Sequence, residues 1–151
     1  MIDFSVQKTG LEHNIQKARE NHIIIPTIAQ MQHPETIPGK IQDQLKNVGL
    51  WDINPLNLFR ITWKNEAKES GGLFQAVPNY IELPPALTGV PCRIVAMVGK
   101  WFPTGCHKVG ASFGCLAPRL VTGQFDATYH HAVWPSTGNY CRGGAFNSKL
   151  L

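Results

Sequence analysis

The sequence predicts an α/β fold in which a partial parallel sheet with flanking helices follows a mostly helical amino-terminal extension. From about residue 80 the pattern runs strand, loop, helix, strand, loop, helix, the order typical of parallel α/β folds. Residues 93–98 (RIVAMV) form a nearly continuous apolar run, which is typical of a strand covered on both faces. The length of 151 residues fits one domain-sized core. We therefore divide the chain into an amino-terminal extension at 1–77 and an α/β domain at 78–151.

Composition narrows the class of protein. Apolar residues make up 43% of the chain, too many for a disordered protein, and charged residues only 16%, against about 25% in an average soluble domain. No apolar run approaches the ~20 residues needed to span a bilayer. The first ten residues lack the apolar core of a signal peptide. We therefore expect a cytoplasmic protein that does not enter a membrane.

Charge is unevenly distributed along the chain. Residues 1–82 contain eight basic and nine acidic side chains, whereas residues 83–151 contain six basic side chains and one acidic. The first part thus has a net charge of −1 and the second part +5, which together give the chain its net charge of +4. The positive second part suggests an anionic ligand or an acidic counterpart. Its basic residues are spread out rather than clustered, so the sequence does not predict a nucleic-acid interface.

Four cysteines could in principle form disulfides or bind a metal. Cys92, Cys106, Cys115 and Cys141 form no CxxC pair, and no pair of histidines follows at zinc spacing. We expect free thiols in a reducing compartment and no metal site. The adjacent His130 and His131 would point to opposite faces of a strand, so we interpret them as a turn leading into a strand.

The extension is expected to contain two helices and a strand. Apolar residues at helical spacing predict a surface helix over 11–22. A second helix is expected over 38–48, with Pro38 in its first turn and a glycine after its end. Alternating bulky residues at 58–63 predict a strand. The polar, glycine-ended segment 66–72 is the best candidate for a boundary.

The second part is expected to alternate strands and helices. The expected elements, in order, are a strand at 81–83, a strand at 93–98, a helix at 107–120, a strand at 132–134 and a helix at 140–151. Pro118 should kink or end the helix in which it lies.

The loop before the expected helix at 107–120 contains a candidate nucleophile. Lys108 is the only basic residue, apart from His107, between residues 101 and 118, and its neighbours are small and apolar. Partial burial would lower the pKa of its amine and make the neutral form available to attack a carbonyl carbon. The alternative is a solvated lysine near the start of a helix.

A second loop, Ser136-Thr137-Gly138-Asn139, precedes the last expected helix. The two hydroxyls and the backbone N–H groups can donate to a carboxylate, and the Asn139 amide can donate to a phenolate or carbonyl oxygen. Both loops are expected between a strand and a helix, where α/β folds bind anions. The alternative is an ordinary turn capped by a hydroxyl side chain.

Together the two loops resemble those of the fold-type-II pyridoxal-phosphate enzymes. Thr104-Gly105-Cys106-His107-Lys108 is similar to the lysine loop of tryptophan synthase β chain, and residues 136–139 are similar to the asparagine loop of cysteine and threonine synthases. The resemblance covers about residues 78–151, with Tyr80-Ile81-Glu82-Leu83-Pro84 in the place of an early strand of the family.

The resemblance implies a role for each residue. Lys108 would bind pyridoxal 5'-phosphate as a Schiff base and later move the Cα proton. Asn139 would hydrogen-bond the oxygen on the pyridine ring, and His107 would lie beside the phosphate or orient Lys108. Ser136, Thr137 and Gly138 would bind the substrate carboxylate. The implied protein is a homodimeric lyase or synthase that performs β-elimination or β-replacement on a small amino acid.

Two motifs of the resembled family are not found after Asn139: the glycine-rich phosphate loop and the residue that faces the pyridine nitrogen. We therefore expect this sequence to be the amino-terminal part of a protein more than twice as long; the alternative is a small protein with a frayed last helix. A second functional hypothesis is a catalytically silent fragment or a regulatory or interaction module. A nucleotide-binding role is not predicted, because no GxGxxG motif follows a strand.

Overall fold

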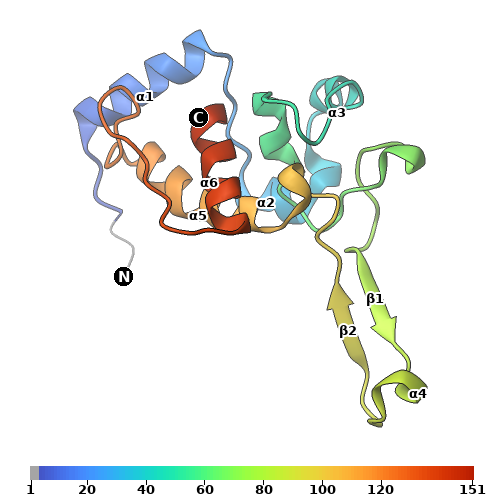
Figure 1. Ribbon diagram of the computed structural model, residues 1–151. Helices are drawn as coiled ribbons and strands as arrows, with labels where there is room; N and C mark the ends of the chain where they lie inside the picture. Colours follow the sequence, from blue (N-terminus) through green and yellow to red (C-terminus); the bar gives the residue numbers. More distant parts are fainter. Residues whose placement is uncertain (1–3) are drawn as a thin grey trace.

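Residues 4–151 are described by a computed structural model that consists of a helical body and a two-stranded arm (Figure 1). The helices are α1 (Lys8–Glu20), α2 (Ile28–Gln32), α3 (Gly39–Leu45), α4 (Pro85–Thr88), α5 (Lys108–Val121) and α6 (Asn139–Leu150). Four 3₁₀ turns add η1 (Pro34–Thr36), η2 (Pro55–Arg60), η3 (Lys68–Ser70) and η4 (Pro103–Gly105). Within residues 4–151, no helix is both long and apolar enough to cross a membrane.

The centre of the body is the packed pair α5 and α6 (Figure 1). Apolar residues of α5 recur at helical spacing on its inner face, and Val109 and Phe113 pack with Phe146 of α6. Leu58 and Ile61, from the part of the chain expected to be an extension, belong to the same core. The main core therefore combines residues from both sides of residue 77.

Helices were the best-predicted elements. The expected helices at 11–22, 38–48, 107–120 and 140–151 correspond to α1, α3, α5 and α6. Pro118 lies inside α5 without ending it, and the helix continues to Val121. Asn14 holds α1 against the end of α5, because its amide donates to Leu120 O at 2.9 Å and to Phe125 O at 2.6 Å.

The expected strand at 58–63 is wrong, because residues 58–60 belong to the 3₁₀ turn η2. Pro55 occupies the first turn, and the Asn54 side chain accepts from the Leu56 N–H at 3.0 Å, so the backbone coils instead of extending. Arg60 is buried and donates to the carbonyl oxygens of Leu45 at 2.7 Å and Gly72 at 2.9 Å. Burial lowers the pKa of Arg60, and these carbonyls partly replace its lost water.

The fold does mix helices with a sheet, but the expected parallel sheet is wrong. The sheet of the described chain has two antiparallel strands, β1 (Tyr80–Leu83) and β2 (Ile94–Met97), with Tyr80 opposite Met97 and Leu83 opposite Ile94. The connection at 84–93 turns back through α4 and Gly89, whose φ is +68°. Neighbouring strands joined by such a local connection pair antiparallel, whereas parallel pairing needs a longer crossover.

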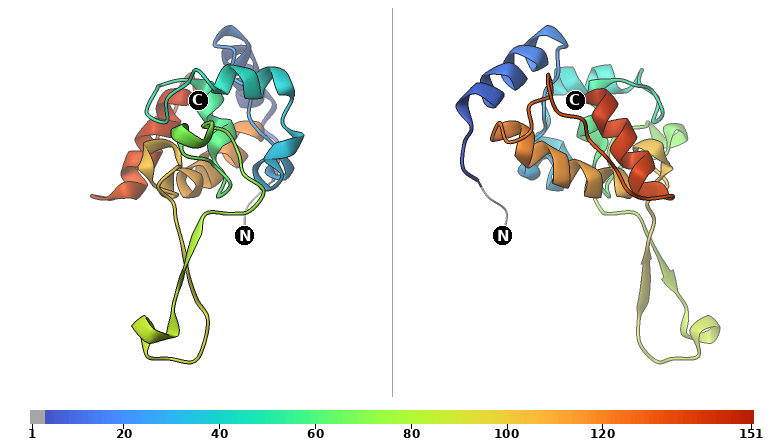
Figure 2. Two further views of the ribbon diagram at one scale, coloured as in Figure 1. Left: turned by 90° about the vertical axis from the view of Figure 1, so that its right-hand side faces the viewer. Right: turned by 60° about the vertical axis from the view of Figure 1, so that its left-hand side comes forward.

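The arm projects away from the helical body (Figure 2). The apolar run at 93–98 is therefore not covered on both faces as expected: Val95 is 46% exposed and Met97 is 47% exposed. The expected strand at 132–134 is also wrong, because this segment has no strand partner in the structure and Val133 is 82% exposed. Trp134 instead packs over α6, where its indole N–H donates to Ser148 Oγ at 3.0 Å.

Candidate functional site

The segment that leads into α5 contains an unusual backbone conformation. Thr104 has φ +67° and ψ 6°, and Gly105 follows with φ +69°. A left-handed conformation is rare for threonine, and strain of this kind concentrates at functional sites. Thr104 is 1% exposed, and its Oγ1 has no hydrogen-bond partner among residues 4–151. Its N–H donates to Leu50 O at 3.3 Å, which ties the loop to the body.

Lys108 is the first residue of α5, and its side chain is exposed. The expected partial burial is therefore wrong, since small neighbours in sequence do not enclose a side chain at the open end of a helix. Its Nζ makes no ion pair or hydrogen bond with the described part of the chain, so the amine is sterically available. Lys100, across the same loop, instead lies over the Trp101 ring, with Nζ 4.6 Å from the ring centroid.

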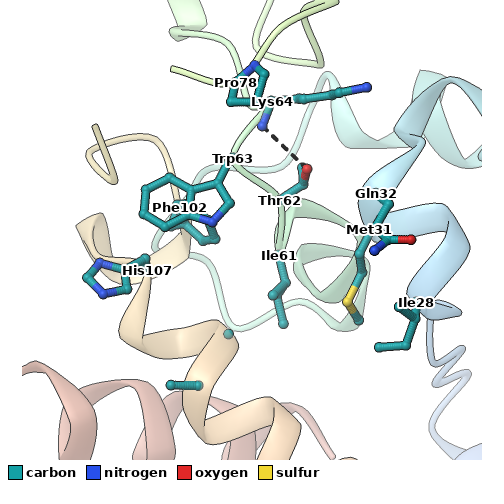
Figure 3. A pocket seen from close by; sticks show the side chains of 12 residues that line it. Ile28, Met31, Gln32, Ile61, Thr62, Trp63, Lys64, Pro78, Phe102 and His107 are labelled. Atoms are coloured by element: carbon teal, nitrogen blue, oxygen red, sulfur yellow. Dashed lines mark hydrogen bonds between the residues drawn. The ribbon is translucent and has the colours of Figure 1, made fainter. Parts of the chain in front are cut away.

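His107 immediately precedes α5 and stacks on Trp63, with ring centroids 5.3 Å apart and an interplanar angle of 26°. Its Nδ1 lies 3.9 Å from the Cys106 Sγ. Phe102 meets the edge of the same indole at 5.0 Å. The three rings form one wall of a cavity next to the start of α5 (Figure 3).

This cavity has a volume of about 460 Å³, which is within the usual size range of small-molecule sites. Ile28 and Met31 of α2 face the aromatic wall, and Ile61 lies between them (Figure 3). α2 is fixed there by a capping box in which Thr27 and Gln30 satisfy each other's backbone N–H groups. The sequence did not reveal this cavity, because Trp63 fell within an expected strand and α2 carries no motif.

Residues 136–138 form an exposed turn that ends where α6 begins, at Asn139. The Gly138 N–H donates to Ser136 Oγ at 3.2 Å, so this hydroxyl caps its own turn. Gly138 O accepts from the Arg142 N–H at 3.3 Å and from the Cys141 thiol at 3.0 Å. The side chains of Thr137 and Asn139 make no hydrogen bond with residues 4–151, so both can reach an external group.

Gly143, in the second turn of α6, packs closely against the first turn of α5. A Cβ at Gly143 would lie 2.8 Å from Lys108 O and 2.8 Å from Val109 N, so only glycine allows the helices to approach this closely. Asn147 continues the contact, since its amide donates to Val109 O and to Ser112 Oγ, both at 2.8 Å. Asn139 precedes Gly143 by one helical turn, about 6 Å along the axis. α6 therefore begins about one turn before the point at which it meets the first turn of α5.

A second polar contact joins the first turn of α6 to the middle of α5. The Tyr140 hydroxyl donates to Cys115 Sγ at 3.4 Å. This hydrogen bond to the thiol raises the pKa of Tyr140 above its usual value of 10.0. Tyr140 also meets the Trp134 ring edge-on, with centroids 5.5 Å apart. The first turn of α6 is thus held by an aromatic ring on one side and by α5 on the other.

Neither disulfides nor a metal cluster organise this region. All four cysteines are free thiols. Within residues 4–151, no group of three or more His, Cys, Asp or Glu side chains is placed to hold a metal ion.

Comparison with protein-family models, with curated proteins and with solved structures found no match to this chain. Functional inference therefore depends on the geometry above and on the resemblance of the two loops.

Proposed function

We propose that the chain belongs to a pyridoxal-phosphate-dependent lyase or synthase that performs β-elimination or β-replacement on a small amino acid. The observation that carries the proposal is the close contact of Gly143 in α6 with Lys108 and Val109 in α5. It brings the helix that begins at Asn139 against the first turn of the helix that begins at Lys108, although the two loops are far apart in sequence.

The chemistry of the donor set fits part of this cofactor. Lys108 offers an unpaired primary amine for an aldehyde carbon, and Asn139 offers an unpaired amide N–H for the oxygen on the pyridine ring. When bound, pyridoxal 5'-phosphate supplies an electron sink for chemistry at the substrate Cα. His107, directly before Lys108, is stacked on Trp63, and in this proposal it would orient the lysine or lie beside the phosphate.

The chain's own contribution is positioning and proton transfer. The Lys108 Nζ would hold the cofactor and then take and return the Cα proton.

The turn before α6 is suited to a substrate carboxylate. Thr137 offers a free hydroxyl, and the first turn of α6 presents backbone N–H groups that have no partner within the helix. Ser136 and Gly138 shape the turn through their mutual hydrogen bond. The first turns of α5 and α6 contain no acidic residue, so each helix keeps the positive potential of its amino end.

The exposure of Lys108 and of residues 136–139 favours a second candidate function. Exposed side chains of this kind can bind a partner protein without supporting catalysis. The second candidate function is therefore an interaction module. The two candidates differ in whether Lys108 forms a covalent bond to the cofactor.

Titration with pyridoxal 5'-phosphate, followed by absorbance spectroscopy, distinguishes these functions. We expect one equivalent to produce a visible band distinct from that of the free cofactor, and Lys108→Ala to lose it. Lys100→Ala is the matched control and should retain the band. A band of equal intensity in wild type and Lys108→Ala would contradict the enzyme proposal and leave the interaction module.

A further inference from the structure

The two edges of the arm differ in their capacity to form hydrogen bonds. The Val98 N–H donates to Asn79 O at 2.9 Å, which makes Asn79 and Val98 a hydrogen-bonded pair. In an antiparallel ladder such pairs alternate, so Tyr80 and Glu82 of β1, and Val95 and Met97 of β2, turn their N–H and C=O groups outward.

Prolines restrict one of these edges. Pro78 and Pro84 continue the outward-facing positions of β1 at both ends, and neither residue has an N–H to donate. Edge prolines of this kind protect a strand against pairing with another chain. The β2 edge has no proline between Pro91 and Pro103, so its outward N–H groups are free along the whole strand. The protected edge is β1 and the open edge is β2.

Charge does not protect β2 either. The one charged side chain next to this strand, Arg93, is already bound to Glu82, with Nε to Oε1 at 2.9 Å and Nη2 to Oε2 at 2.8 Å. Residues 94–98 are all apolar. An exposed apolar edge without proline or free charge is a template for strand addition.

We propose that two copies of this chain pair antiparallel through β2, with a two-fold axis beside Ala96. The axis places Val95 of each copy opposite Met97 of the other as hydrogen-bonded pairs. The two Ala96 residues then face each other in a non-hydrogen-bonded pair, where the backbones approach most closely and a small side chain fits. Arg93 lies opposite Gly99 of the second copy, so no like charges meet.

A second copy is the occupant because the edge is complementary to itself. An isologous pair needs one surface that matches its own image, and an uncharged strand whose central residue is alanine meets that condition. Pairing converts two isolated ribbons, which are marginally stable alone, into one four-stranded sheet. The proposal does not depend on the pyridoxal-phosphate proposal, because no residue of the arm belongs to that site.

Sedimentation velocity of the full chain, from low to high micromolar concentration, tests the pairing. We expect a monomer–dimer equilibrium that Val95→Pro weakens by about 10-fold or more, because each copy loses one inter-chain donor. Tyr80→Pro, which removes the corresponding outward donor on β1, is the matched control and should dimerise like wild type. A chain that is monomeric throughout, a Val95→Pro variant that dimerises normally, or a Tyr80→Pro variant that dissociates would each overturn the proposal.

A cross-link tests the register independently of the proline variants. In a Cys92→Ser background, Ala96→Cys should form an inter-chain disulfide on mild oxidation, because Cβ atoms in such pairs lie about 4.5–5.5 Å apart. Ile81→Cys, placed on the outer strand, should not. Cross-linking through Ile81→Cys but not Ala96→Cys, or through neither, would overturn the proposed axis.

Discussion

The two candidate reactive side chains of this molecule lie at the amino ends of two helices. Lys108 and Asn139 are the first residues of α5 and α6, and neither side chain is engaged with residues 4–151. The residues around them are fixed: Thr104 is buried, and His107 is stacked on Trp63. The backbone before Lys108 is thus held in place, while the Lys108 and Asn139 side chains are exposed.

Asn139 is expected to contribute to cofactor binding without being required for it. Asn139→Ala should keep the covalent bond to Lys108 but shift the visible band, because the hydrogen bond to the ring oxygen is lost. If that oxygen is charged, we expect binding to weaken by about 1.5–3 kcal/mol. Asn47→Ala, an exposed asparagine before η2, is the control. An unchanged spectrum and affinity in Asn139→Ala would make Asn139 a turn residue only.

Asp126 is expected to make stability depend on acid. Its carboxylate accepts from the Thr128 hydroxyl at 2.6 Å and the Thr128 N–H at 2.8 Å, and lies 2.7 Å from His13 Nδ1. The Thr128 hydroxyl, and then His13, lower the pKa of Asp126 from 3.8 to about 2. A lowered folded-state pKa stabilises the fold above pH 3.8, and this contribution is lost as the pH falls towards 2.

Acid unfolding followed by circular dichroism measures this contribution. Asp126→Asn should reduce the loss of stability between about pH 4 and pH 2, since the amide does not titrate. Asp43→Asn, which removes a surface partner of Lys46 on α3, is the control. Identical acid profiles for wild type and Asp126→Asn would show that this cluster does not link α1 to the loop after α5.

At the scale of elements, the close contact between α5 and α6 depends on Gly143. Gly143→Ala places a Cβ against the backbone of Lys108 and Val109, which cannot move aside as a side chain can. We expect the free energy of unfolding to fall by about 1–3 kcal/mol from overpacking, despite the better helix propensity of alanine. Thermal or urea unfolding gives the value.

Gly114 in α5 provides the control, because a Cβ there meets nothing within 4 Å. Gly114→Ala should stabilise the protein by about 0.5–1 kcal/mol through helix propensity alone. If Gly143→Ala were as stabilising as Gly114→Ala, the close approach of α5 and α6 would not be a feature of the folded protein.

Helices were predictable from the sequence because their signals are local. The spacing of apolar residues along 107–120 and the position of Pro38 depend only on neighbours a few residues away. Sheet topology depends on which strands pair, and the local sequence pattern does not identify the partner of a strand. The run at 93–98 suits a buried central strand as well as an exposed ribbon, and only the local turn at Gly89 decides its antiparallel pairing with β1.

The positions of the candidate site residues along the chain were predictable, but their environment was not. Lys108 and Asn139 were expected at the starts of helices, and the structure has them as the first residues of α5 and α6. The exposure of Lys108 is set by what lies beyond the amino end of α5, and no local pattern reports it. The cavity beside His107 combines α2 with Trp63 and Phe102, which are separated along the chain and carry no shared motif.

The whole molecule divides into a body with a core and an arm without one. α5 and α6 bury their inner faces, whereas Tyr80, Ile81, Val95 and Met97 of the arm are 46–57% exposed. Local stability follows buried contacts, so the arm should open more readily than the body. In hydrogen exchange, we expect the paired amides of β1 and β2 to exchange faster than those of Val109–Leu120.

Concentration dependence is an internal control for that measurement. Arm amides should become more protected as concentration rises if β2 pairs between copies, whereas the amides of α5 should not change. Protection in the arm equal to that in α5 at every concentration would contradict the division into a stable body and a labile arm.

The most direct test of the account is the site at which pyridoxal 5'-phosphate attaches. The chain is loaded with one equivalent of cofactor, reduced with borohydride, digested and mapped by mass spectrometry. We predict that the pyridoxyl group is found on Lys108, whose amine has no partner among residues 4–151. Attachment chiefly to Lys100, or an even distribution over the surface lysines, would contradict the claim that α5 and α6 together form the cofactor site.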